Sequence, residues 1–197
     1  MEIFFATSNS HKVSEAAAIL DPLGHRVQPL LLNGRPLELV EPQAEGIEEV
    51  ARSKLEQAVE ATSGMLGSQT AILVEDCGLF VDSLGGFPGP FSSYVESTIG
   101  LQGILSLMEG VESRGAEYRA VAVLGFEGET LRSSGACKGV ISTTASGSNG
   151  FGYDPIFVPE EGDGRTCGEL SPHEKSQVSH RARALKGLSE LLNPPSK

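Results

Sequence analysis

The chain is organised around one stretch, ILVEDCGLFVDSLGGFPGPFSSY, which covers residues 72–94. It opens with a short apolar run over residues 71–74, typical of a buried strand that ends before Glu75. A second short strand over residues 79–82 and a loop rich in glycine and proline follow. Because ligands bind outside the carboxyl ends of strands in open α/β sheets, the adjacent acids Glu75 and Asp76 predict a site. The alternative is a surface loop that follows two acids by chance.

Length and composition predict one soluble domain over residues 1–197. Hydrophobic residues make up 39% of the chain and charged residues 21%, so a sizeable core can form. The sequence has no apolar run of membrane-spanning length, and its first residues do not resemble a signal peptide. The three cysteines are widely spaced, which argues against a disulfide framework or a zinc motif. We therefore expect a cytoplasmic protein with no membrane association.

The net charge of −11 limits the choice of partner. Nucleic acid is held along its phosphates by a basic face, so binding to a nucleic acid polymer is disfavoured. A small anion can still bind to an acidic protein where a few cations and backbone N–H groups converge, or where a metal ion intervenes. The charge therefore favours a small ligand over a polymer.

The N-terminal segment has a layout that suits an anion. An apolar strand over residues 3–6 leads into a polar loop and then a helix over residues 11–20, with Asn9 or Ser10 as the N-cap. The first N–H groups of a helix are unpaired and the helix dipole is positive there. Lys12 lies in the first turn, where a bound anion would explain a cation. The alternative is an ordinary capped helix with a solvated lysine.

The remaining elements follow from periodicity and turn signals. Helices are predicted over residues 46–63, 101–108 and 174–192, the last capped by Ser171, and strands over residues 25–32 and after Asp154. A hairpin is predicted around residues 127–129, between strands 117–126 and 130–142. Glu49 and Lys54 lie on the helix 46–63, where periodicity alone favours a solvated face.

These residues suit a phosphorylated ligand that carries an aromatic group. Hydroxyls, backbone N–H groups and lysines neutralise phosphates, and carboxylates hold Mg²⁺. A carboxylate beside a metal-bound water can act as a general base. An exposed aromatic such as Phe151, in a glycine loop, can stack on a nucleobase. The sequence has no Walker loop, no dinucleotide fingerprint and no nucleophile elbow, so these sites are not expected.

Four motifs, in order along the chain, resemble the inosine triphosphate pyrophosphatase (Ham1-like) family, and FSSYV at residues 91–95 followed by TIG at residues 98–100 is most similar to its archaeal branch. The first is ATSNSHKVSE at residues 6–15, and the second is EDCGL at residues 75–79 with GGFPG at residues 85–89. The third is GFGYDPIF at residues 150–157, and the fourth is SHRARAL at residues 179–185. Together they cover the chain from end to end.

The resemblance implies an elongated α/β fold with two lobes, a long mixed twisted sheet flanked by helices, and a central substrate cleft. It also implies a homodimer. The implied activity is Mg²⁺-dependent hydrolysis of non-standard purine nucleoside triphosphates (ITP, dITP and XTP) to the monophosphate and pyrophosphate. Such an enzyme removes deaminated purines from the nucleotide pool.

The resemblance also implies roles for individual residues. Asp76 matches the catalytic acid, which contacts the metal and activates the attacking water, and Glu49 matches the metal-binding glutamate. Glu75 supports Asp76. The triphosphate is expected at the loop residues Thr7, Ser8, Asn9, Ser10, His11 and Lys12.

The base and sugar are assigned to the later motifs. The residues matched to them are Phe151, Gly152, Tyr153, Asp154, Lys175, His180 and Arg181. The resemblance implies that Phe151 stacks on the base, that Lys175 makes a contact on the phosphate and sugar side, and that His180 and Arg181 read the purine 6-oxo group. Cys77 stands where the family usually has Ser or Thr, and Cys is the weaker hydrogen-bond partner. Cys77 is kept as a binding residue that contacts the substrate less strongly or through its backbone.

Two alternatives remain open. A septum-formation-inhibitor-like pyrophosphatase acting on modified nucleotides would also open with a strand and a polar loop, but its later motifs have no match here. A nucleotide-binding regulator without turnover is disfavoured because Lys12, Glu49 and Asp76 occur together. Release of pyrophosphate from different nucleotides separates the three possibilities.

Overall fold

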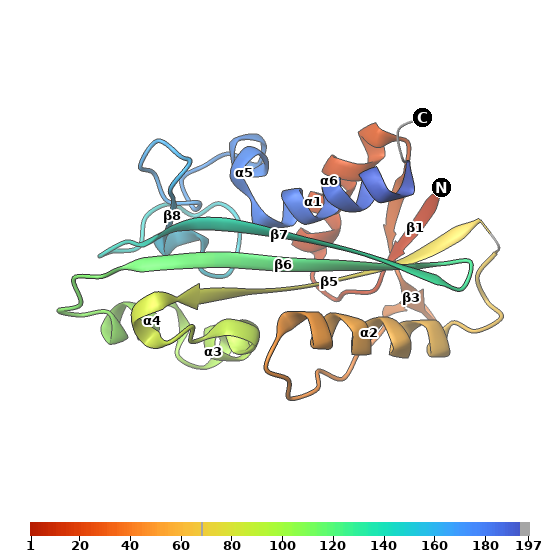
Figure 1. Ribbon diagram of the computed structural model, residues 1–197, viewed down its shortest axis with the longest axis horizontal. Coiled ribbons are helices and arrows are strands. Elements are labelled where there is room, and N and C mark those ends of the chain that lie inside the picture. Colours follow the sequence, from red (N-terminus) through yellow and green to blue (C-terminus); the bar gives the residue numbers. More distant parts are fainter. Residues whose placement is uncertain (68, 194–197) are drawn as a thin grey trace. The chain divides into compact units, whose positions relative to one another are not determined.

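A computed structural model describes residues 1–67 and 69–193. Its main feature is a six-stranded sheet with the order β2-β1-β5-β6-β7-β8 (Figure 1). Strand β1 pairs in parallel with both β2 and β5, whereas β7 and β8 are antiparallel, so the sheet is mixed. The strands are β1 (Glu2–Phe5), β2 (Arg26–Pro29), β5 (Thr70–Val81), β6 (Gly115–Phe126), β7 (Glu129–Ile141) and β8 (Phe157–Pro159). Two short strands, β3 (Leu31–Leu32) and β4 (Arg35–Pro36), pair separately.

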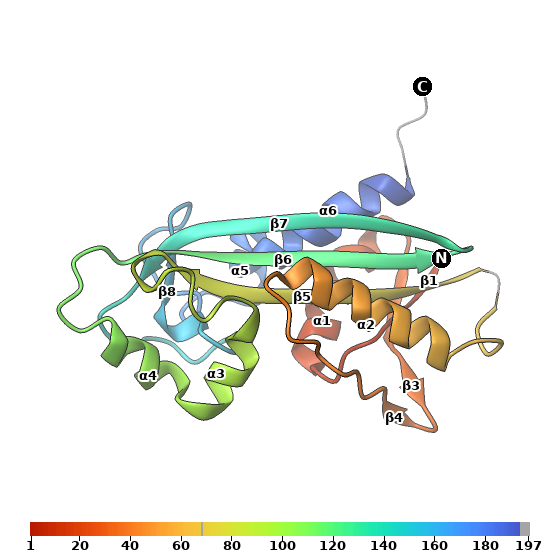
Figure 2. The ribbon, with the colours of Figure 1, turned by 60° about the horizontal axis from the view of Figure 1, so that its bottom comes forward.

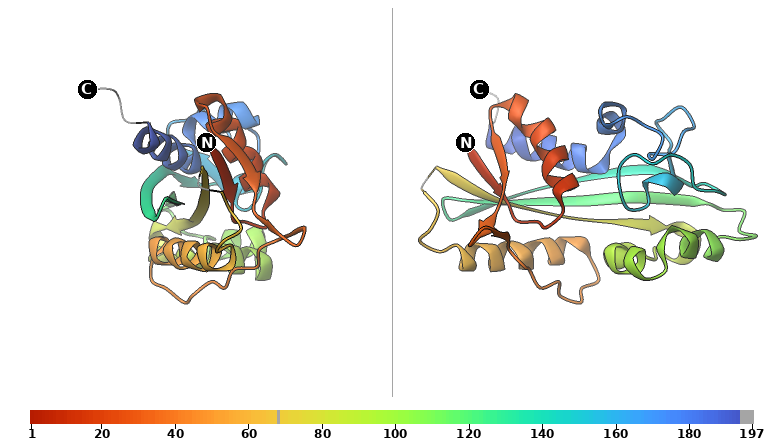
Figure 3. Two further views of the ribbon diagram at one scale, coloured as in Figure 1. Left: turned by 90° about the vertical axis from the view of Figure 1, so that its right-hand side faces the viewer. Right: turned by 180° about the vertical axis from the view of Figure 1, so that it is seen from behind.

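Contacts divide the chain into two compact units. Unit 1 comprises Met1–Asp76, Ala120–Gly135 and Arg181–Lys197, and unit 2 comprises Cys77–Arg119 and Ala136–His180. In unit 1, α1 (Ser10–Leu20) and α6 (His180–Leu192) cover one face of the sheet, and α2 (Ile47–Ala61) covers the other (Figures 1 and 3).

Unit 2 is built in the same layered way. Helices α3 (Ser92–Thr98) and α4 (Gly100–Leu107) lie on one face of its part of the sheet, and α5 (Pro172–Val178) lies on the other (Figure 2). A cluster of buried side chains fills the space between these layers. Its larger members are Leu79, Ile104, Met108, Tyr118, Tyr153, Ile156 and Phe157.

The glycines of the central stretch bring its loop against the strand. A Cβ on Gly78 would lie 2.2 Å from the carbonyl oxygen of Gly89, so only glycine allows this approach. The Ser92 hydroxyl donates to that same oxygen at 2.7 Å and accepts the N–H of Leu79 at 2.8 Å. The loop is therefore part of the scaffold of unit 2.

The predicted end of the strand before Glu75 is wrong. Strand β5 continues from Thr70 to Val81, and its positions are buried almost throughout. Both acids are buried, with Glu75 3% and Asp76 6% exposed, because cations reach them from the helices on either side. Partners from distant parts of the chain allow acids to lie inside a buried strand.

The last helix also differs from the prediction, because it is two helices. The capping box of Ser171 and Glu174 starts α5 as expected. Ser179 then adopts an extended conformation with ψ of 134°, and α6 starts at His180. The hairpin between β6 and β7 is confirmed, with positive φ at Glu127 and Gly128. Helix α3 was not predicted.

Two composition-based expectations can be compared with the structure. Across residues 1–67 and 69–193, none of the helices combines the length and the apolar character that a membrane crossing requires. All three cysteines lie in the described part of the chain, and none of them forms a disulfide.

Candidate active site

The loop after β1 forms the first part of the site, and it belongs to unit 1. Asn9 is the N-cap of α1, and its side-chain oxygen accepts the N–H groups of His11 at 2.9 Å and Lys12 at 3.3 Å. The Thr7 hydroxyl in turn accepts the N–H of Asn9 at 3.2 Å. The polar residues of the loop thus fix its backbone, and a phosphate bound there would share N–H groups with the N-cap.

Glu75 is the anionic centre on the side of the sheet covered by α1 and α6. Lys12 Nζ lies 2.8 Å from its carboxylate, and Arg181 Nε lies 3.1 Å from the other carboxylate oxygen. Arg181 also pairs with Glu15 of α1. Since Arg181 is only 1% exposed, its charge is balanced by these two acids inside the protein.

Asp76 is engaged from the opposite side, by α2. Lys54 Nζ lies 2.8 Å from Asp76 Oδ1 and 2.5 Å from a carboxylate oxygen of Glu41. Burial raises the pKa of Asp76 above its ordinary value, while the charges of Lys54 and Lys12 act against that rise. Asp76 is therefore a buried carboxylate whose proton affinity is increased, as suits a group that must accept a proton.

The two acids do not act as a pair on one surface. Successive residues of a strand point to opposite faces of the sheet, so Glu75 faces α1 and α6 while Asp76 faces α2. The sequence alone predicts that they lie side by side at a strand end. Their different partners separate a structural acid, Glu75, from a candidate reactive acid, Asp76.

Glu41 and Glu49 differ in their relation to Asp76. Glu49 lies in the first turn of α2 with an exposed side chain, and among the described residues no ion pair or hydrogen bond joins it to Asp76 or Lys54. Its metal role stays a prediction. Glu41, which sequence reasoning missed, shares Lys54 with Asp76. In the sequence, Glu41 could be recognised as a candidate only as an acid in the loop before α2.

Unit 2 contains the glycine loop expected to contact a base. The Asp154 carboxylate accepts the N–H of Phe151 at 2.8 Å and pairs with Lys175 Nζ at 2.7 Å. Lys175 Nζ also lies 4.9 Å from the centre of the Phe151 ring. Gly150 has a φ of +74°, and a Cβ there would lie 2.0 Å from Asp154. Asp154 and Lys175 are buried, so they hold the loop and leave Phe151 half-exposed.

Tyr153 differs from Phe151 because its side chain is buried in the protein. Its side chain is 3% exposed and its hydroxyl donates to the carbonyl oxygen of Ser92 at 2.8 Å. Burial raises the pKa of the Tyr153 hydroxyl well above its ordinary value, and the charge of Glu96 adds to this. The side chain therefore anchors the loop to α3, and a ligand contact at this position would use the backbone.

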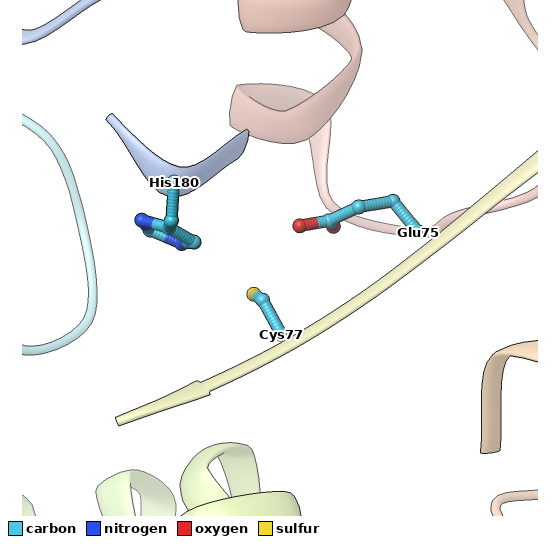
Figure 4. Close-up of side chains that lie close together, drawn as sticks. All are labelled: Glu75, Cys77 and His180. Carbon is cyan, nitrogen blue, oxygen red and sulfur yellow. The ribbon is translucent and has the colours of Figure 1, made fainter. Parts of the chain in front are cut away.

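His180 and Cys77 meet in unit 2 (Figure 4). The ligand atoms of the two side chains lie within 4.8 Å of each other. The His180 ring is 5% exposed and stacks on Tyr118, with centroids 4.6 Å apart and planes 8° apart. The imidazole is thus held in a fixed orientation at the start of α6.

The predicted residues thus fall into two sets. In unit 1 the structure brings Lys12 to Glu75, and Lys54 links Asp76 to Glu41. In unit 2 it brings together Phe151, Asp154 and Lys175, and separately Cys77 and His180. His11, Ser8 and Ser10 lie at the start of α1 beside Lys12, and Gly152, at φ of +63°, supplies the turn before Tyr153.

The fold and the site first define a class: a mixed-sheet α/β protein with buried acids on a central strand, each balanced by lysine or arginine. The particular family follows from comparison with known proteins. The profile of the Ham1 family matches residues 3–191, and the chain belongs to this family.

Relatives match the chain over nearly their whole length. A dITP/XTP pyrophosphatase of Hyperthermus butylicus is 41% identical over 190 residues, which is 96% of this chain and 94% of that protein. One of Methanothermobacter marburgensis is 43% identical over 192 residues, covering 96% and 95%. The solved structure of a HAM1 protein from Coxiella burnetii has a TM-score of 0.81 at 31% identity and covers 98% of both chains. The α/β fold with its mixed sheet flanked by helices is confirmed.

Proposed function

We propose that this protein is a nucleoside triphosphate pyrophosphatase that hydrolyses ITP, dITP and XTP to the monophosphate and pyrophosphate. The observation that carries the proposal is the buried Asp76 carboxylate, held by Lys54 on a strand whose neighbouring acid is held by Lys12. The names of the archaeal relatives, dITP/XTP pyrophosphatases, support the substrate class. The biological role is removal of deaminated purines from the nucleotide pool in the cytoplasm.

Asp76 is the general base of the proposed reaction. Its carboxylate takes a proton from the water that attacks the α-phosphorus, and pyrophosphate leaves. Burial raises the pKa of Asp76, which strengthens it as a base. Lys54, at 2.8 Å, keeps the carboxylate ionised and correctly placed before the reaction.

Lys12 acts on the phosphates. Its side chain is 15% exposed and lies at the start of α1, where unpaired N–H groups and the helix dipole favour an anion. The loop residues Thr7 to His11 bind the triphosphate around it. Positive charge here offsets the charge that develops on the leaving pyrophosphate.

The carboxylates around Lys54 fit a divalent cation. Glu41 and Asp76 already hold one cation between them, the Lys54 ammonium, and oxygen ligands are those that Mg²⁺ prefers. Asp76 with Glu49, the residue that the resemblance assigns, or with Glu41, which the geometry adds, would hold the ion. When bound, Mg²⁺ polarises the phosphoryl oxygens and lowers the pKa of water.

The purine is assigned to the loop of unit 2. Phe151 stacks on the base, and the neighbouring backbone contacts it in the turn that Asp154 and Lys175 hold. His180 and Arg181 donate hydrogen bonds to the 6-oxo group of the purine. The same donors would face the amino group of adenine, which is also a donor, so adenine is disfavoured. Such a site can reject the wrong base by roughly 10⁴ or more.

The protein is proposed to act as a homodimer, as the resemblance implies. Sedimentation of the purified protein tests this assembly. A measured mass of one chain at working concentrations would contradict it.

A panel of nucleotides tests the activity. Purified protein with Mg²⁺ is offered ITP, XTP, GTP, ATP and a methylated pyrimidine triphosphate, and pyrophosphate release is measured. We expect fast release from ITP and XTP only. Release from the methylated pyrimidine would favour an enzyme for modified nucleotides, and tight binding of ITP without release would favour a regulator.

A further inference from the structure

Cys77 and His180 lie close together, and the proposed function assigns His180 to the base without explaining why a thiol lies beside it. Cys77 is half-buried on β5, and His180 is almost fully buried at the start of α6. The sulfur and a ring nitrogen lie within 4.8 Å of each other, and Figure 4 shows both side chains projecting into the same space. The fold therefore brings a sulfur atom and a nitrogen atom together from residues that are about a hundred positions apart in the chain.

Both side chains have little freedom to move apart. Cys77 lies inside a long strand, so its Cα–Cβ direction is fixed by the sheet. The His180 ring is stacked on Tyr118 at 4.6 Å, and Tyr118 packs in turn against Phe157 at 4.6 Å. A ligand that bridges the two residues would thus meet a largely preformed site, with a small entropic cost of ordering.

Thiolate and imidazole are a characteristic donor set for zinc. With Zn–S of ~2.3 Å and Zn–N of ~2.0 Å in a tetrahedral site, sulfur and nitrogen lie about 3.5 Å apart. The pair, at no more than 4.8 Å, needs an approach of about 1.3 Å at most to reach that spacing, which rotation of the Cys77 side chain about its Cα–Cβ bond can provide. We propose that Cys77 and His180 form a binding site for a thiophilic divalent cation, with Zn²⁺ as the physiological example.

Binding of the ion at this pair involves proton loss and electron-pair donation only. The Cys77 thiol loses its proton to solvent, the sulfur and one imidazole nitrogen each donate an electron pair, and no redox change occurs. Water fills the remaining positions.

The proposed zinc site differs in chemistry from the carboxylates that suit Mg²⁺. Mg²⁺ is hard and prefers oxygen, whereas sulfur selects zinc and similar ions. Glu75, two residues before Cys77 on β5, is already balanced by Lys12 and Arg181. The site therefore rests on two protein ligands, and its affinity is moderate compared with a four-ligand structural zinc site.

The consequence for catalysis rests on the proposed function. If His180 contacts the purine, an ion on its imidazole blocks that contact, so zinc competes with the nucleotide. Chelation of the ion then restores the rate, and the protein is sensitive to free zinc because Cys stands at position 77.

Cobalt titration tests the site directly. Bound Co²⁺ gives a thiolate-to-metal charge-transfer band only where sulfur is a ligand, and Zn²⁺ added afterwards removes the band by displacement. The folded wild-type protein is compared with Cys77→Ser, Cys77→Ala and His180→Gln, each checked by circular dichroism. The matched controls are Cys137→Ser, at a buried cysteine, and His173→Gln, at an exposed histidine.

We expect the band in wild type and both controls, its loss in both Cys77 variants, and at least about tenfold weaker zinc binding in His180→Gln. A wild-type protein without the band, or a band that persists in the Cys77 variants, overturns the proposal. Inhibition is measured separately, as the zinc concentration that halves each protein's own rate with ITP. Zinc binding without inhibition would uphold the site and overturn the competition, whereas inactivity with ITP in the presence of a zinc chelator would overturn the proposed function alone.

Discussion

Lys54 Nζ lies 2.8 Å from the Asp76 carboxylate, and both side chains are about nine-tenths buried. The ammonium group favours the ionised form of Asp76, while burial favours the protonated form and raises the pKa. The reactivity of Asp76 thus depends on a residue of α2, far away in sequence.

This pair predicts a pH effect. In Lys54→Met the favourable charge is lost, so the pKa of Asp76 rises further and the acid limb of kcat/KM moves to higher pH by roughly 1 unit or more. The measurement is kcat/KM for ITP between pH 5 and 9. Because the rate needs ionised Asp76, a limb that stays in place or moves to lower pH would contradict the assignment.

Removal of the base itself gives the second prediction. Asp76→Asn keeps the shape of the side chain but cannot accept a proton, so kcat for ITP falls by about 10²–10⁴-fold. Asp82→Asn is the matched control, because Asp82 is exposed just beyond the end of the same strand. Full activity in the Asp76 variant would refute its role.

The third prediction concerns the metal. Each of Glu41→Gln and Glu49→Gln should raise the Mg²⁺ concentration for half-maximal rate about tenfold or more if its carboxylate takes part in holding the ion. Glu41 shares a cation with Asp76, and the resemblance assigns Glu49. A Mg²⁺ dependence like that of wild type in one variant would remove that residue from the site.

A fourth prediction tests the scaffold of the base loop. Tyr153→Phe removes a buried hydrogen bond to the Ser92 carbonyl and should lower the free energy of unfolding by about 1–2 kcal/mol. Tyr94→Phe serves as the control, because Tyr94 is 70% exposed. Urea unfolding measures both. Equal stability of the two variants would mean that the Tyr153 hydroxyl does not anchor the loop.

Much of the fold could be predicted from local signals. The N-cap of α1 at Asn9, the capping box at Ser171 and the two-residue turn at Glu127 and Gly128 all depend on residues close together in sequence. Glycines and polar residues also mark the loop before α1 and the loop at residues 150–154, whose binding roles stay predictions. These features need only a few neighbouring residues to form.

What could not be predicted depends on distant partners. In the sequence, Glu75 and Asp76 indicate a strand end because an isolated buried acid is costly. The strand β5 continues through them because Lys12, Arg181 and Lys54 pair with the two acids. Their opposite orientation follows from that continuity. The break at Ser179 has no proline or glycine beside it, so local sequence predicts one helix where the structure has two.

The most direct test of the proposed reaction is to measure which product takes up the oxygen atom of the attacking water. ITP is hydrolysed in ¹⁸O-labelled water with Mg²⁺, and the products are analysed by mass spectrometry. Attack at the α-phosphorus with Asp76 as base predicts one ¹⁸O atom in the inosine monophosphate and none in the pyrophosphate, with no such label when Asp76→Asn replaces wild type over the same time. Label in the pyrophosphate, or release of orthophosphate in its place, would contradict the account.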